Sequence, residues 1–317
     1  MEKKTVIITG SNSGLGYQCA KNIAMCDPNY YIVLACRNTE KANAAAEMLK
    51  SETRNPNIFT LELDLESLSS IRMFYEDFSQ ANLPPLYAVV CNAGISAGGV
   101  PGQLYTKDGF EMIFGVNHLG HFLLSNLLLN RMEKNGRIVF VSSDMHEPPA
   151  FLRIKMVYEN AKAISVATPG MLQYCTSKLC NLYCTYEMAR LIDTRTDKQI
   201  TVNAFNPGAM SDTNFIRVEG SALLQGIMKS FSRVMSRIIG KQSSSVKSGA
   251  NLASLITNSS YDKVSGKYVD RGEVIKSSLL SYDENNAREL WKTSMKLSKL
   301  SQNETIFGHE NLNNKII

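Results

Sequence analysis

Tyr174 and Lys178 are the residues of this 317-residue chain whose spacing most directly suggests proton chemistry. They lie four residues apart in a helical pattern, so they share one helix face and can meet the same substrate atom. The pKa of tyrosine is about 10, so it exchanges protons poorly at neutral pH unless a cation such as Lys178 stabilises the tyrosinate. The pair predicts a proton relay. A solvated helix face is the alternative for this pattern taken alone.

A glycine-rich turn follows the first apolar run of the chain, residues 5–8. Glycines let the backbone approach a pyrophosphate, and the amides at the start of the following helix attract the anion. We therefore expect the cofactor to bind at Gly10, Ser11, Asn12, Ser13, Gly14, Leu15 and Gly16. The spacing is G-x-x-x-G-x-G and not the common G-x-G-x-x-G, so a glycine-rich turn without a ligand is the alternative.

The end of the second apolar run, residues 31–36, indicates which dinucleotide binds. Folds that prefer NAD(H) carry an acid about 20 residues past the glycines, where it bonds the ribose 2′-hydroxyl. This chain carries Cys36 and Arg37 there. Because a guanidinium suits a 2′-phosphate, the predicted cofactor is NADP(H), and an exposed strand-end arginine is the alternative.

Three further apolar runs end in polar or glycine residues. The runs cover residues 59–63, 87–91 and 137–141, and they are followed by Asp64, Leu65, Asn92, Ala93, Gly94, Ser142 and Ser143. Asp64 either lies beside the adenine or caps the helix that begins near Ser67. We expect the Asn92 amide to hold the adjoining strand, and Gly94 to let the cofactor lie close.

The alternation of apolar runs with helical patterns predicts the fold class. The expected helices cover residues 17–25, 39–50, 110–131, 172–191 and 283–300. Right-handed βαβ units then give an α/β fold, a doubly wound parallel sheet of the Rossmann type with helices on both faces. We expect one nucleotide-binding domain over residues 1–300, with a variable segment near 209–245 that covers the substrate. Residues 301–317 are polar and predict a flexible tail.

Asn117 lies in the middle of the predicted helix over residues 110–131. A buried polar side chain needs partners, so Asn117 either bonds to backbone or holds a water. His118 and His121 flank it and are interpreted as packed or surface histidines. They lack a set of metal-like partners, and no metal site is predicted.

Composition excludes several functions. A net charge of +5 is too mild to indicate nucleic acid binding. Seven scattered cysteines indicate reduced thiols in a cytosol-like compartment. No N-terminal signal peptide is predicted, and no apolar run approaches the ~18 residues of a membrane span.

A basic amphipathic pattern over residues 222–240 predicts a substrate lid, a contact with an anionic membrane, or plain packing. We expect a cytoplasmic protein, with membrane association through this segment as an alternative.

Together these patterns resemble the short-chain dehydrogenase/reductase family over residues 4–275. The resemblance rests on the glycine turn, Asp64, Asn92-Ala93-Gly94, Asn117, the set of Ser143, Tyr174 and Lys178, and Pro207-Gly208. Residues 34–37, 116–122 and 177–181 look like the branch that holds retinol dehydrogenases and light-dependent protochlorophyllide reductases.

The resemblance implies a role for each residue that matches the family pattern. Tyr174 would be the general acid or base, and Lys178 would lower its pKa and contact the cofactor ribose. Ser143, the second serine of its pair, would polarise the substrate oxygen, and Asn117 would hold a water. The cofactor would also contact Asp64, Leu65, Asn92, Ala93, Gly94, Tyr174, Pro207 and Gly208.

The implied activity is an NADP(H)-dependent oxidoreduction. A hydride would move between nicotinamide and the carbonyl or alcohol of a substrate. That substrate would be a small molecule that is bulky and apolar, such as a retinoid, a steroid or an aldehyde. Family likeness also implies a homodimer or a homotetramer. Two alternatives are kept: a light-dependent reductase of a tetrapyrrole double bond, and a non-catalytic nucleotide-binding scaffold.

Overall fold

The computed structural model describes residues 2–96, 104–168, 170–210 and 242–307. An eight-stranded sheet forms its centre, with the strand order β10-β9-β6-β5-β4-β1-β2-β3. The strands are β1 (Lys4–Thr9), β2 (Tyr30–Cys36), β3 (Ile58–Glu62), β4 (Leu86–Cys91), β5 (Met132–Val141), β6 (Thr201–Asn206), β9 (Lys267–Asp270) and β10 (Glu273–Ile275). All neighbours in this sheet are parallel except β10, which pairs antiparallel with β9.

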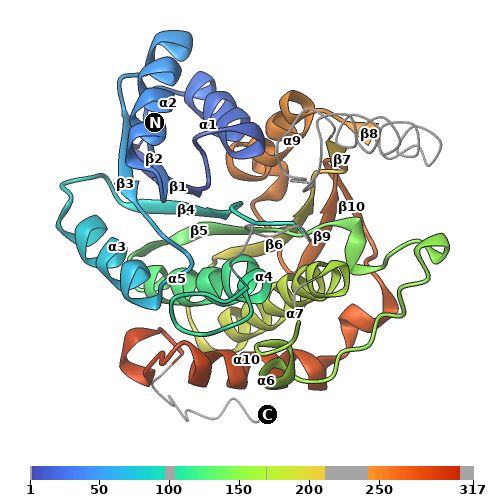
Figure 1. Ribbon diagram of the computed structural model, residues 1–317. Coiled ribbons are helices and arrows are strands. Elements are labelled where there is room, and N and C mark those ends of the chain that lie inside the picture. The colour runs from blue at the N-terminus through green and yellow to red at the C-terminus, as the bar shows by residue number, and fades with distance from the viewer. Residues whose placement is uncertain (1, 97–103, 169, 211–241, 308–317) are drawn as a thin grey trace.

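Helices cover both faces of the sheet (Figure 1). One face carries α1 (Gly14–Cys26), α2 (Thr39–Thr53) and α9 (Ser245–Thr257), and the other carries α3 (Leu68–Gln80), α5 (Gly120–Leu129) and α7 (Met171–Arg195). The doubly wound α/β fold is therefore confirmed. Every residue of β4 and β6 is buried, as expected for parallel strands that are covered on both faces.

A further helix, α10 (Glu284–Leu297), lies outside α5 and α7 (Figure 1). The Trp291 ring packs edge-on against Phe122, with ring centroids 4.9 Å apart, and Phe307 packs against Trp291 at 5.6 Å. Arg72 forms an ion pair with Glu304. The predicted flexible tail, residues 301–317, thus includes residues that are ordered, because residues 301–307 pack on the domain. Residues 308–317 lie outside the described residues.

Several elements toward the C-terminus were not predicted from the sequence. They are the helix α9 and the strands β9 and β10, which extend the sheet beyond β6. The described parts of the variable segment are β7 (Ala209–Met210) and β8 (Gln242–Ser243), which pair in parallel. The amphipathic pattern over residues 222–240, with its expected lid or membrane contact, lies outside the described residues.

The predicted long helix near residues 110–131 exists, but its middle is irregular. It consists of α4 (Met112–Phe114), a π-helical turn η1 (Gly115–Leu119) and α5. Contrary to the sequence analysis, the stretch Met112–Leu129 is long and apolar enough to cross a membrane by length and composition. The whole stretch is buried inside the domain, as is usual for a core helix.

Candidate active site

The carboxyl ends of β1 and β4 are held together by Asn92 and Thr9. Asn92 Nδ2 donates to the carbonyl oxygens of Thr9 at 2.7 Å and Gly10 at 3.2 Å. The backbone amides of Asn92 and Ala93 both donate to Thr9 Oγ1 at 2.9 Å. The expectation that the Asn92 amide holds the adjoining strand is confirmed. A Cβ atom added to Gly10 would lie 2.9 Å from Ala93 Cα, so the two strand ends meet at van der Waals distance.

Within the described residues, the start of α1 after the glycine turn offers donors to an anion. Gly10 and Gly14 have φ angles of +62° and +57°, which favour glycine. Ser13 is the exposed N-cap residue of α1, and its side chain makes no capping hydrogen bond. The amides of the first turn of α1 have no acceptor within the helix. These donors fit a pyrophosphate.

Two residues of the turn point inward instead. Ser11 is buried, and its Oγ donates to the carbonyl oxygen of Ile8 at 2.8 Å. The Leu15 side chain is buried in the core between the sheet and α1. Asn12 is partly buried. Ser11 and Leu15 could therefore contact a cofactor only through their backbone.

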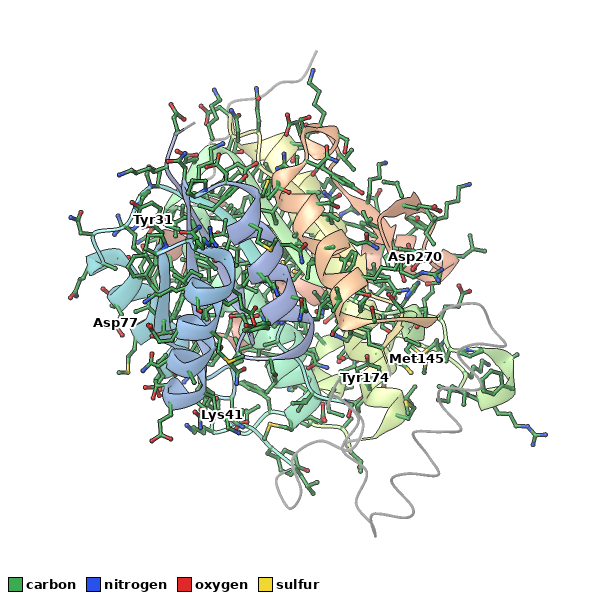
Figure 2. All side chains as sticks on the ribbon, turned by 90° about the horizontal axis from the view of Figure 1, so that it is seen from above. Tyr31, Lys41, Asp77, Met145, Tyr174 and Asp270 are labelled. Atoms are coloured by element: carbon green, nitrogen blue, oxygen red, sulfur yellow. The ribbon has the colours of Figure 1, made fainter. Side chains whose placement is uncertain are left out.

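Tyr174, Ser143 and Lys178 meet at the carboxyl end of β5. Tyr174 shares a hydrogen bond with the Ser143 side chain. Lys178 Nζ lies 5.6 Å from the centroid of the Tyr174 ring and donates to the carbonyl oxygen of Val141 at 3.1 Å. Figure 2 shows Tyr174 beside Met145, which belongs to the 3₁₀ turn η2 (Asp144–His146) that follows Ser143. The fold thus brings the predicted hydroxyl pair and ammonium together.

The π-helical turn η1 positions Asn117 against this group. Asn117 Nδ2 donates to the Ile95 carbonyl oxygen at 3.0 Å and to Ser177 Oγ at 3.1 Å, and its Oδ1 accepts from the Ile95 amide at 2.8 Å. Asn117 is therefore bonded to backbone, and its expected role in holding a water stays a prediction. A Cβ atom added to Gly94 would lie 3.1 Å from Asn117 Oδ1 and 3.7 Å from Lys178 Nζ.

The two serines after β5 have different partners. Ser142 is buried, and its Oγ donates to the Lys178 carbonyl oxygen at 2.8 Å, which joins β5 to α7. Ser143 is less buried, accepts from the Met145 amide at 3.2 Å and bonds Tyr174. This geometry favours Ser143 as the serine that meets a ligand.

A charged cluster of Arg37, Asp64, Glu66 and Lys107 lies at the ends of β2 and β3. Arg37 forms an ion pair with Glu66, and Asp64 Oδ2 accepts from Lys107 Nζ at 2.7 Å. Asp64 does not cap α3, because that position belongs to Ser67, which accepts from the Ser70 amide. Glu66 and Lys107 were not predicted, since nothing local to either residue reveals a partner at positions 37 or 64.

The remaining residues predicted to contact the cofactor follow the carboxyl ends of β6 and β3. Gly208 has a φ angle of +74°, and its amide donates to Asn206 Oδ1 at 3.1 Å. The Pro207 carbonyl oxygen accepts from Ser248 Oγ at 2.6 Å, which ties the end of β6 to α9. The Leu65 side chain is buried in the core on the α5 side of the sheet.

Both helix histidines are buried, which confirms the packed interpretation. His121 Nε2 lies 2.8 Å from Thr9 Oγ1, and its Nδ1 lies 3.2 Å from the Asn117 carbonyl oxygen. Burial lowers the pKa of His121 to about 4 and that of His118 to about 3. His121 therefore stays neutral and connects β1 to the π-helical turn. The described residues contain no group of His, Cys, Asp or Glu that could hold a metal ion.

The sequence also matches a known family. Residues 4–166 match the model of the short chain dehydrogenases. The chain belongs to this family. It is 31% identical over 304 residues to the polyprenol dehydrogenase of Danio rerio, covering 93% of this chain and 86% of that protein. It is 39% identical over 207 residues to the human retinol dehydrogenase 13, covering 65% of this chain and 58% of that protein. The predicted retinol dehydrogenase-like branch is confirmed.

Another relative differs in length, and solved structures share the fold. The chain is 36% identical to the WW domain-containing oxidoreductase of Danio rerio, and the match covers 68% of this chain and only 52% of that protein. A crystal structure of a blue fluorescent protein from a metagenomic library with NADPH superposes with a TM-score of 0.63 at 20% identity, covering 85% of this chain and 96% of that chain. The 3-ketoacyl-(acyl-carrier-protein) reductase from Brucella melitensis with NADH gives 0.61 at 20% identity, covering 86% and 99%.

This family member is an NAD(P)-dependent oxidoreductase with a small-molecule substrate. The charge states of Tyr174 and Lys178 in its site follow from the burial of these side chains. Burial of the hydroxyl raises the pKa of Tyr174, although the residue as a whole is half-buried, and the Ser143 hydrogen bond opposes this increase. Burial also lowers the pKa of Lys178 to about 8. The expectation that Lys178 lowers the tyrosine pKa is not met in the protein alone, since burial disfavours both charged forms.

Proposed function

We propose that the protein is an NADP(H)-dependent oxidoreductase that moves a hydride between nicotinamide and the carbonyl or alcohol carbon of a bulky apolar substrate. The observation that carries this proposal is the hydrogen-bonded pair of Tyr174 and Ser143 beside Lys178. This group lies at the carboxyl ends of the strands, the edge at which doubly wound sheets bind ligands and at which the glycine turn also lies.

The bound cofactor would supply the hydride, and the chain would supply the proton. Tyr174 would donate its proton to the substrate oxygen, while the Ser143 hydroxyl would donate a hydrogen bond to the same atom. Lys178, whose Nζ lies 5.6 Å from the centroid of the Tyr174 ring, would stabilise the tyrosinate that results through its positive charge. The free amides of α1 and the Ser13 hydroxyl would hold the pyrophosphate.

Two features support the substrate class. Met171 lies one turn before Tyr174 on the same helix face and is 46% exposed, so it could contact an apolar ligand bound at Tyr174. Two relatives are named for the alcohols polyprenol and retinol, namely polyprenol dehydrogenase and retinol dehydrogenase 13.

Arg37 supports the choice of NADP(H). It follows β2 directly, and its side chain is 57% exposed, so it can reach a 2′-phosphate. A guanidinium binds a phosphate through two parallel hydrogen bonds, which a 2′-hydroxyl cannot match.

The proposal is tested by following the absorbance of the reduced cofactor with a panel of retinoid, polyprenyl, steroid and simple aldehydes. Each reaction is run with NADPH and with NADH, and all are run in the dark. We expect dark turnover of a bulky apolar aldehyde with NADPH preferred, and no turnover by Tyr174→Phe. Equal turnover by Tyr174→Phe would contradict the assigned chemistry. Turnover of a tetrapyrrole pigment in a parallel illuminated reaction, together with no turnover of any aldehyde in the dark, would favour the pigment reductase that the sequence left open.

A further inference from the structure

The charged cluster combines two exposed cations with two buried carboxylates. The side chains of Arg37 and Lys107 are 57% and 61% exposed, whereas those of Glu66 and Asp64 are each 7% exposed. Buried carboxylates have few rotamers and little solvent around them, while exposed cations stay mobile and hydrated. The carboxylates therefore form the fixed half of the cluster.

Glu66 is held in place by its backbone as well as by its burial. Its amide donates to Asp64 Oδ1 at 3.1 Å, and its carbonyl oxygen accepts from the Lys107 amide at 3.0 Å. The next residue, Ser67, is the N-cap of α3, and the Leu68 amide donates to Asp108 Oδ2 at 2.7 Å. These bonds fix the loop after β3, so the carboxylate position belongs to the scaffold.

The ion pair lies where a dinucleotide presents its ribose 2′ group. Arg37 follows Cys36, whose Sγ lies 3.8 Å from Ser11 Oγ in the glycine turn. In doubly wound folds the 2′ substituent meets the residues at the end of the second strand, an acid for a hydroxyl or an arginine for a phosphate. This chain carries both kinds of residue at that place, the arginine from β2 and the acid from the loop after β3.

We propose that Glu66 is a specificity-determining residue that reduces the preference of this enzyme for NADP(H) over NAD(H). A 2′-phosphate carries a charge of about −1.5 to −2, so it would compete with Glu66 for Arg37 and be repelled by the carboxylate. A 2′-hydroxyl carries no charge and can donate a hydrogen bond to that carboxylate. The two residues act in opposite directions, with Arg37 favouring the phosphate and Glu66 favouring the hydroxyl.

This inference rests on the proposed contact between Arg37 and the 2′ group, and its test needs no knowledge of the substrate. Dissociation constants of NADPH and NADH are measured by the fluorescence of the reduced nicotinamide for wild type, Glu66→Gln, Arg37→Met and the double variant. Glu66→Gln keeps the size of the side chain and removes its charge. We expect the NADPH-to-NADH affinity ratio to rise about 10-fold in Glu66→Gln and to fall about 10-fold in Arg37→Met.

Two comparisons make the test specific. In the Arg37→Met background, Glu66→Gln should still weaken the binding of NADH. Its strengthening of NADPH binding should be smaller than in the wild-type background, since part of that effect is the release of Arg37 from Glu66. Glu47→Gln is the matched control, because this exposed carboxylate on α2 pairs with Lys50 and its loss changes the net charge equally. The control should leave the affinity ratio unchanged. If Glu66→Gln unfolds, Glu66→Asp serves instead, because the shorter carboxylate should raise the ratio in the same direction.

The result that overturns the inference is an affinity ratio in Glu66→Gln equal to that of wild type, or one that falls. Failure of the proposed cofactor preference has a different signature. In that case the wild type binds NADH more tightly, and Arg37→Met leaves the ratio unchanged, whatever Glu66→Gln does.

Discussion

The two ends of this site are built in opposite ways. The tyrosine cluster, formed by Asn117, Ser143, Tyr174 and Lys178, consists of buried or half-buried groups bonded to backbone carbonyls or to one another. The charged cluster instead joins exposed cations to buried carboxylates at the surface.

This difference indicates where each end can change. Buried polar groups are costly to leave without a partner, so a substitution in the tyrosine cluster disturbs chemistry or stability by a large factor. Ion pairs in which one partner is exposed contribute little to stability. The charged cluster can therefore change cofactor choice without unfolding the domain.

Tyr174→Phe should have the largest effect. Removal of the hydroxyl deletes the proton donor, which is worth about 10²- to 10⁴-fold in turnover. The ring and its packing remain, so the melting temperature and the affinity for the reduced cofactor should change little. Turnover is measured at saturating cofactor and substrate. Retention of more than about a tenth of wild-type turnover would show that another group donates the proton.

Lys178→Met should abolish turnover and yet stabilise the fold. Burial lowers the pKa of Lys178 from an ordinary 10.5 to about 8, so below pH 8 the folded protein must bury an ammonium. The penalty is about 3 kcal/mol at most and is present in full below the folded pKa. Between pH 8 and 10.5 the unfolded chain binds more protons than the folded one, so the penalty disappears as pH rises.

The stability gain of Lys178→Met over wild type should therefore be largest at pH 7 and shrink toward pH 10. Urea unfolding of both proteins at each pH measures the difference, in which the contributions of all other groups cancel. Loss of the bond to the Val141 carbonyl oxygen is offset, because Asn181 Nδ2 also donates to that oxygen at 3.1 Å. A wild type more stable than the variant at pH 7 would mean that the ammonium is well solvated.

The two serines after β5 provide a matched pair with smaller effects. Ser143→Ala removes the hydroxyl that meets Tyr174 and should lower kcat/KM about 100-fold, as the loss of one oxyanion donor does. Ser142→Ala removes the buried bond to the Lys178 carbonyl oxygen and should cost about 1 kcal/mol of stability. Its turnover should stay within a few-fold of wild type. The reverse pattern would assign the chemistry to Ser142.

Much of the fold was predictable because its signals are local. The strands β1, β2 and β4 are apolar runs buried over most of their length, and each ends at a polar or glycine motif. The order of those motifs then predicted that Ser143 and Tyr174 meet, although the irregular segment between them gave no geometry.

The missed features depend on contacts between distant residues. β9 has four residues, and it forms a strand because it pairs with β6. The helix α9 approaches α1 at Gly249, where an added Cβ atom would lie 2.3 Å from Gln18 Cβ, a contact no local pattern reveals. The direction of the Tyr174 pKa shift was also missed, because burial depends on the whole fold and outweighs the spacing of one lysine.

The charged cluster should show the smallest effect, a dependence of cofactor selectivity on salt. Because the guanidinium of Arg37 is 57% exposed, added salt screens its attraction to a 2′-phosphate. Raising ionic strength from about 0.05 M to about 0.5 M should weaken NADPH binding several-fold more than NADH binding, since the two cofactors share the pyrophosphate contacts and differ only at the 2′ position.

Dissociation constants of both cofactors at both salt concentrations measure the NADPH-to-NADH affinity ratio, and turnover at saturating NADPH serves as the control. It should stay constant, because the buried tyrosine cluster is little screened. An equal loss for both cofactors would place the screened charges at the pyrophosphate, and the contrast between the two ends of the site would then fail.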